Sequence, residues 1–102
     1  MITIDAATTE EQFREMWGND FVTKCALRLS HVDTMFFGIR EYTGVKMHEI
    51  SVRETVITET CTSMSKLLKA EMLNSKEDAV TALWAEVVKY KKFVKREMYP
   101  KD

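Results

Sequence analysis

Chain breaks are scarce in this protein, and that scarcity restricts its fold more than any other feature of the sequence. Glycine and proline are the residues that most often interrupt regular structure. Only three glycines and one proline, Pro100, occur among 102 residues. Few breaks imply long elements, and long elements are more typical of helices than of strands. We therefore predict a fold built mainly from long α-helices.

Two long segments carry an apolar repeat that supports helices. In segment 19–43 the apolar positions are separated by steps of three and four, as in an antiparallel helical bundle or coiled coil. Segment 46–73 has the same spacing, and a turn at Gly44–Val45 would fold the two into an antiparallel hairpin. Facing positions would then sum to about 89, since both helices have the same rise per residue. The predicted facing pairs are Ile39 with Ile50, Val32 with Ile57, Leu29 with Cys61, and Cys25 with Met64.

Two further helices are expected at the ends of the chain. A short helix over 9–17 would be capped by Thr8 and followed by Gly18, after an extended arm at Ile2–Ile4. A last helix would begin after Ser75, with Asp78 in its first turn, and would end at Pro100.

The predicted fold class is all-α: an antiparallel helical bundle of three long helices plus a short N-terminal helix, forming a single domain over residues 1–102. One alternative stays open. Residues 50–62 are rich in Val, Ile and Thr, and these side chains also suit a strand. Residues 46–60 could therefore be strand instead of helix.

The composition is that of an ordinary globular protein. It is 45% hydrophobic and 30% charged, and the formal net charge is −1, so neither global disorder nor a strong field toward nucleic acid or membrane is expected. No secretory signal and no membrane-spanning run is evident, which predicts a cytoplasmic protein without a membrane partner. Cys25 and Cys61 are expected as free thiols and small core residues, and whether they ever pair stays open.

The sequence contains no motif of the common enzymes. The three glycines are isolated and cannot build a phosphate-binding loop, and no G-x-S-x-G, C-x-x-C or H-E-x-x-H occurs. The hairpin would place His48 near Glu41 and far from His31, which argues against a two-histidine metal site. We therefore predict no catalytic residues, no metal and no cofactor, and a protein that is not an enzyme.

The first functional hypothesis follows from an excess of apolar residues in the second predicted helix. Several lie off its seam and would form a spare apolar face, and seven methionines add adaptable contact surface. We expect a protein–protein interaction module, such as an adaptor, inhibitor or assembly factor, that self-associates as an oligomer. Its compact size is typical of small viral or mobile-element accessory proteins. The expected partner-binding residues are Trp17, Leu27, Met35, Phe37 and Tyr42.

The alternative hypothesis is a nucleic-acid or nucleotide-binding protein. The run from Lys89 to Arg96 holds five cations in eight residues, interleaved with Tyr90 and Phe93. Cations can contact phosphates and aromatic rings can stack on bases, although cations are also favoured at the end of a helix by its dipole. The phosphate-binding residues in this hypothesis are Lys89, Lys91, Lys92, Lys95 and Arg96.

Overall fold

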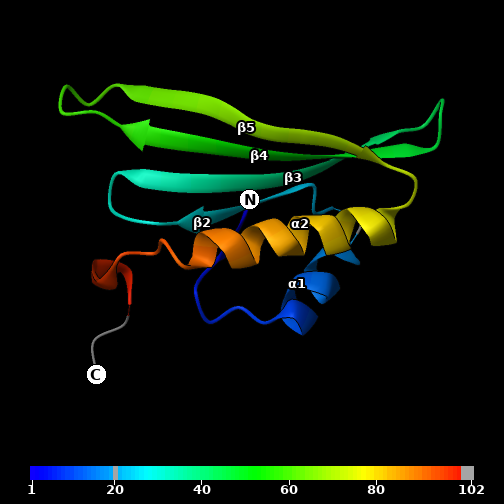
Figure 1. Cartoon of the computed structure of the whole chain (residues 1–102), viewed down its shortest axis with the longest axis horizontal. Coiled ribbons are helices and arrows are strands. Elements are labelled where there is room, and N and C mark those ends of the chain that lie inside the picture. Colours follow the sequence, from blue (N-terminus) through cyan, green and yellow to red (C-terminus); the bar gives the residue numbers. More distant parts are fainter. Residues whose placement is uncertain (20, 100–102) are drawn as a thin grey trace.

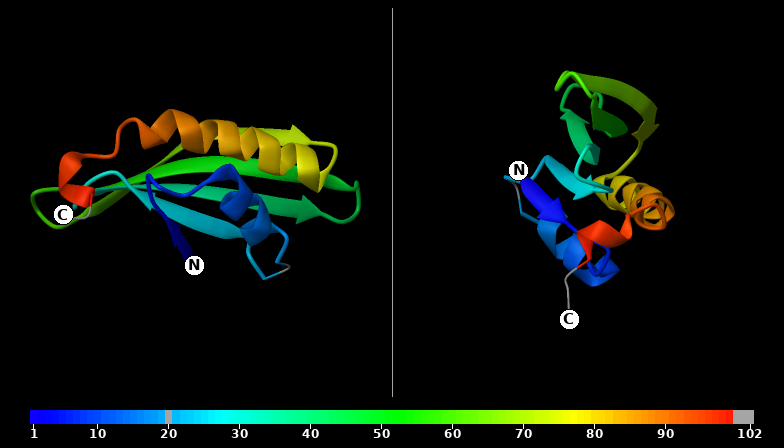
Figure 2. Two further views of the ribbon diagram at one scale, coloured as in Figure 1. Left: turned by 90° about the horizontal axis from the view of Figure 1, so that it is seen from below. Right: turned by 90° about the vertical axis from the view of Figure 1, so that its left-hand side faces the viewer.

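The computed structural model describes residues 1–19 and 21–99, which form one mixed β-sheet with two helices on one of its faces (Figures 1 and 2). The strands lie side by side in sequence order. Only β1 and β2 run parallel, because α1 connects them, and the other neighbours are antiparallel. Along the chain the elements are β1 (Ile2–Ile4), α1 (Glu10–Trp17), β2 (Lys24–Arg28), β3 (Asp33–Tyr42), β4 (Met47–Ile57), β5 (Ser63–Leu73), α2 (Lys76–Lys91) and a 3₁₀ turn, η1 (Arg96–Met98).

The predicted all-α bundle, with its coiled-coil seam, is therefore wrong. Segments 19–43 and 46–73 form four strands, and the apolar positions that decide this recur every second residue. Cys25 and Leu27 are the fully buried positions of β2, and the same alternation brings the β3 and β4 side chains to one buried face. The alternative of strand within 46–60 is confirmed by β4. The buried strand residues on this face are Ile4, Cys25, Leu27, Met35, Phe37, Ile39, Ile50 and Val52.

The strands were hidden in the sequence because the turns before β3 and after β4 contain no glycine or proline. Between β2 and β3, the amides of Leu29 and Ser30 both donate to the Asp33 carbonyl, at 2.8 and 3.1 Å. Lys46 and Cys61 take left-handed backbone conformations, with φ of 53° and 61°, in the next two turns. Glycine is the residue that usually fills such positions, so with Cys61 in this place the turn between β4 and β5 lacks the expected signal.

The predicted hairpin nevertheless exists, as a β-hairpin. β3 and β4 are joined by a turn at residues 43–46, and Ile39 lies opposite Ile50 as predicted. The Ile57 amide donates to the Val32 carbonyl at 2.7 Å. The predicted contacts of Cys25 with Met64 and of Leu29 with Cys61 are wrong, because β2 leaves the hairpin and pairs with β3 on its other side. The same register puts His48 opposite Glu41, as predicted, with Nε2 and Oε1 4.0 Å apart.

The structure confirms the extended arm, the short first helix and the start of the last helix, but α2 ends at Lys91 and does not continue to Pro100 as predicted. Thr9 caps α1, one residue later than predicted, and forms a reciprocal capping box with Gln12. Ser75 caps α2, and its hydroxyl accepts from the Asp78 amide at 3.1 Å. Pro100, expected to end the last helix, lies outside the described residues.

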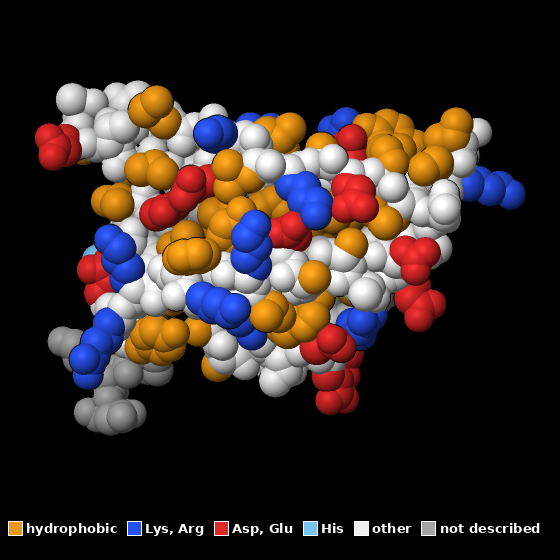
Figure 3. Space-filling model, viewed as in Figure 1, with side chains coloured by type: hydrophobic (Ala, Val, Ile, Leu, Met, Phe, Trp, Pro, Cys, Tyr) orange, Lys and Arg blue, Asp and Glu red, His pale blue; other side chains and the backbone are white. Residues whose placement is uncertain are grey.

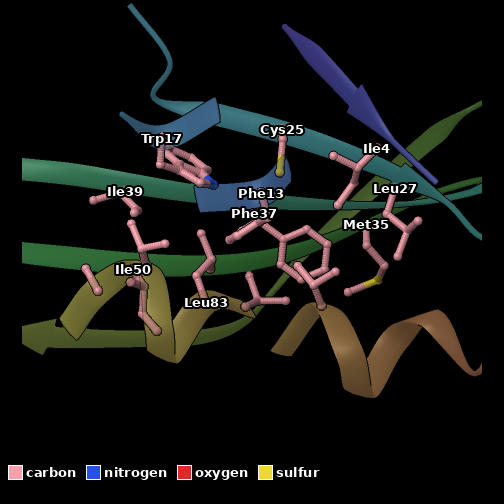
Figure 4. Packing of buried hydrophobic residues seen from close by; sticks show 14 of the residues in the cluster. Ile4, Phe13, Trp17, Cys25, Leu27, Met35, Phe37, Ile39, Ile50 and Leu83 are labelled. Carbon is pink, nitrogen blue, oxygen red and sulfur yellow. The ribbon is translucent and has the colours of Figure 1, made fainter. Parts of the chain in front are cut away.

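The core lies between the sheet and the helices (Figure 4). Val80, Leu83 and Val87 on α2 are buried against the apolar face of the sheet, and α1 adds Phe13 and Trp17, whose ring centroids are 5.9 Å apart. Cys25 belongs to this core, as predicted. Cys61 does not, because it lies exposed in the turn between β4 and β5.

Candidate functional site

The two edges of the sheet differ sharply in length and exposure. β1 has three residues and ends on the buried side chain of Ile4. β5 has eleven residues, and every one from Ser63 to Met72 is exposed, with only Leu73 half-buried. No other described element lies along the outer edge of β5 (Figure 1). A long exposed edge strand offers unpaired backbone N–H and C=O groups to another strand.

The exposed edge strand also carries large apolar side chains. Met64 is 63% exposed, and Leu67, Leu68 and Met72 are exposed as well. In monomeric proteins, edge strands are usually short or made unattractive to other strands. An eleven-residue edge with four exposed apolar side chains is therefore the strongest candidate for an interaction surface in the described part of the chain.

β5 is fixed in place by contacts with the rest of the molecule. The Lys69 ammonium lies 2.9 Å from Glu86 on α2 and 3.5 Å from Glu71 on its own strand. Both carboxylates raise the pKa of Lys69, with the hydrogen bond to Glu86 as the largest cause. Leu68 is an extra residue in the pairing with β4, since Val52 pairs with Lys69 and Arg53 with Leu67. The strand is thus anchored on α2, with a bulge at Leu68.

The face of the sheet that is opposite α2 carries a shallow depression. Its floor is made of small residues that neighbour one another across β3, β4 and β5, namely Gly38, Ser51 and Ala70. A Cβ atom on Gly38 would approach the Ser51 hydroxyl to 3.0 Å, so a larger residue at this position would require that hydroxyl to move. The depression measures about 590 Å³, and its charged lining is mixed in sign: Lys24, Arg40, Glu41, Glu49 and Arg53.

The five residues predicted to bind a partner do not form a surface. Trp17, Leu27, Met35 and Phe37 are buried in the core, and Tyr42 is half-buried near the end of β3, where its hydroxyl donates to Glu49 at 3.3 Å. The prediction assumed a helix with a spare apolar face. In a strand, alternate residues point inward, so Leu27, Met35 and Phe37 build the core instead.

The five predicted phosphate-binding cations lie at the end of α2 and in the segment after it, but they are not all free to bind a ligand. Lys89 and Lys91 lie in its last turn, and the other three follow it. Lys91 is engaged internally: its ammonium donates to the Thr8 carbonyl and lies 4.6 Å from the centre of the Trp84 ring. Its half-buried position lowers its pKa through desolvation. The other members of the set are exposed: Lys89, Lys92, Lys95 and Arg96.

The edge surface escapes sequence reasoning because its residues carry no motif. The spacing of three and four places Leu68 on a helical seam, where it would be buried. The available signal was the content of Val, Ile and Thr in the preceding strand, which favours a sheet in this part of the chain. A strand there needs a neighbour to pair with, and segment 63–73 follows it directly. Nothing in the sequence of β5 itself shows that its second edge stays open.

Two ionisable groups have shifted pKa values for different reasons. Burial raises the pKa of the Cys25 thiol to about 12, which keeps it protonated and unreactive. The neighbouring carboxyl group of Asp33 is the main cause of the raised pKa of Glu54. Within residues 1–19 and 21–99, no three His, Cys, Asp or Glu side chains are grouped so as to hold a metal ion. No described helix is long and apolar enough to span a membrane.

Comparison with known proteins adds no relative. No protein-family model, no curated protein sequence and no solved structure matches the chain. The function must therefore be argued from the surfaces of the molecule.

Proposed function

We propose that this protein is an interaction module that self-associates by pairing β5 with β5 of a second copy. The open edge of β5 carries the proposal, because eleven residues of strand present backbone groups and apolar side chains without a described neighbour. Strand addition at such an edge is a common mode of protein recognition. Two copies related by a two-fold axis present the same edge to each other, which favours an antiparallel pair.

The sequence of β5 is complementary to itself around Ala70. With the axis at this residue, Lys69 lies opposite Glu71 of the second copy, and the two-fold symmetry repeats this pair of opposite charges. Leu68 then lies opposite Met72, which brings together two apolar side chains that are exposed in one copy. Opposite charges and apolar pairs directly across two strands both favour pairing.

The proposed contact is small, so the dimer should be reversible. Each new backbone hydrogen bond contributes about 1 kcal/mol net, and each favourable cross-strand pair about 0.2–1 kcal/mol. Association itself costs at least about 4 kcal/mol. We therefore expect a dimer that dissociates on dilution rather than an obligate one.

Sedimentation velocity over a range from micromolar to millimolar concentration tests the proposal. The wild-type chain should shift from monomer to dimer. Glu71→Lys should weaken the dimer, since the new lysine of each copy then lies opposite Lys69 of the other. Lys69→Glu should weaken it too, because the new glutamate lies opposite Glu71. Mixed together, the two variants should form a heterodimer, because both cross-strand pairs again join opposite charges.

The matched control is Glu59→Lys, which makes the same charge change at an exposed position in the turn before β5. This position lies outside the proposed pairing, so the dimer should persist. A wild-type chain that stays monomeric at millimolar concentration overturns the proposal. So does a dimer that Glu71→Lys leaves unchanged, or a mixture of the two variants that forms no heterodimer.

A further inference from the structure

A second surface lies at the C-terminal end of α2, on a different part of the molecule from the edge of β5. Phe93 directly follows Lys92, the cap residue of the helix, and is 60% exposed. Figure 3 shows Lys and Arg side chains gathered over this end of α2 and the segment that follows. The exposed cations within four residues of Phe93 in the sequence are Lys89, Lys92, Lys95 and Arg96.

The charge of this surface is mainly positive, with one exposed acid, Glu97, directly after Arg96. The segment 87–96 contains five Lys or Arg and no acid, in a chain whose formal net charge is −1. The helix dipole accounts for cations in the last turn of α2, including Lys89. It does not account for Lys95 and Arg96, which lie beyond the helix, or for an exposed phenylalanine among them.

The segment that carries these cations is held against the rest of the molecule. The Lys95 amide donates to the Leu29 carbonyl at 2.7 Å, which ties the segment to the residue that follows β2. The Lys91 ammonium holds the end of α2 to the Thr8 carbonyl. Backbone that is fixed in this way loses little conformational freedom when a ligand binds, which favours binding.

One side of the Phe93 ring is supported from within the protein. Tyr90 lies against it, with ring centroids 6.2 Å apart and planes inclined at 50°, and the Lys89 ammonium lies 5.4 Å from the Tyr90 ring. With 60% of the residue exposed, much of the ring stays accessible from outside. An aromatic ring that is supported on one side and open on the other, with cations around it, is typical of a stacking platform for bases.

We propose that this surface binds single-stranded nucleic acid, with a base stacked on Phe93 and phosphates contacted by Lys89, Lys92, Lys95 and Arg96. An unpaired base is needed because bases in a duplex have no free face for the ring. An anionic membrane is a poorer fit. Membrane-surface helices insert a broad apolar face, whereas the apolar face of α2 is buried on the sheet.

Fluorescence anisotropy with a labelled thymidine oligonucleotide and a uridine oligonucleotide tests this inference. Four phosphate contacts predict a salt slope of log K against log salt of about −3. Phe93→Ala should weaken binding roughly tenfold, the range expected for the loss of one stacked base. Phe21→Ala is the matched control, since Phe21 is 93% exposed and lies in a loop without such a group of cations. Lys92→Ala should make the salt slope shallower by about 0.7.

Phe93 is exposed, so its alanine variant should keep the wild-type circular dichroism spectrum, and a preserved spectrum shows that the binding loss is local. No binding at low salt overturns the inference, as does equal weakening by Phe93→Ala and Phe21→Ala. Tighter binding of vesicles rich in phosphatidylserine than of oligonucleotides also overturns it. The inference does not rest on self-association: the Glu71→Lys variant should keep its affinity per chain even where it no longer forms dimers.

Discussion

Two adjacent phenylalanines provide a sharp test of the fold. Phe37 is fully buried, and its ring centroid lies 6.2 Å from that of Tyr90 on α2. Phe36 points to the opposite face of the sheet, where it is half-buried and the Lys24 ammonium lies 5.1 Å from its ring. Replacing each residue by alanine removes the same atoms from two different environments.

The expected losses of stability differ by several kcal/mol. Phe37→Ala removes a fully buried ring and leaves a cavity, which costs about 3–5 kcal/mol. Since a domain of this size has a free energy of unfolding of about 5–15 kcal/mol, that loss is a large fraction of the total. Phe36→Ala should cost about 1 kcal/mol, the centre of the range for ordinary substitutions.

Urea unfolding followed by circular dichroism measures both values. The two variants should share the wild-type dependence of the free energy on urea, and only the midpoint should move. Similar losses for Phe36→Ala and Phe37→Ala would falsify the alternation on which the strand assignment of β3 depends.

Three further predictions concern single side chains. A thiol reagent should modify one cysteine in the native protein and two after denaturation, because Cys61 is exposed while burial raises the pKa of Cys25 to about 12; two fast native thiols would contradict the core. Cys61→Gly should raise the free energy of unfolding by about 1 kcal/mol by relieving the left-handed conformation, and no change in a urea titration would contradict that turn. The raised pKa of Glu54 means that the folded state binds more protons than the unfolded state just above pH 4.5, so its stability falls as the pH rises through that window. Glu54→Gln should therefore be more stable than wild type at pH 7, and its advantage should disappear below pH 4.5. A constant difference across this range would refute the effect of the Asp33 carboxyl group on Glu54.

The register of the central hairpin was predictable, although its secondary structure was not. Positions that face each other in any antiparallel hairpin have a constant sum that depends on the turn alone, because both arms have the same rise per residue. Placing the turn at Gly44–Val45 was therefore enough to bring Ile39 opposite Ile50, in strands as in helices. The helices α1 and α2 were found because their caps are local features of the sequence.

The other strands were missed because the turns replace glycine with other residues. Hydrogen bonds to the Asp33 carbonyl and the strained backbone of Cys61 reverse the chain where the sequence shows no break. Without visible turns, short runs of alternating apolar residues merged into spacings of three and four. The predicted partner surface failed for the same reason, since Phe37 and Leu27 were placed on a helix face that does not exist.

The cations at the end of α2 were found from composition, because a run of like charges is visible without a fold. The open edge of β5 could not be found in this way. Whether a strand has one neighbour or two depends on where the chain goes next, and here residues 74–75 lead into α2 and not into a sixth strand.

The position of α2 after the last strand matters while the protein is being made. The chain is synthesised from its N-terminus, so all five strands emerge before the helix that covers them. At about 5–20 residues per second, the apolar face formed by Phe37, Ile50 and Val52 stays uncovered for a second or more. During that interval the nascent sheet has both an open edge and an uncovered apolar face. A chaperone or a neighbouring nascent chain would therefore find its largest binding surface at this stage.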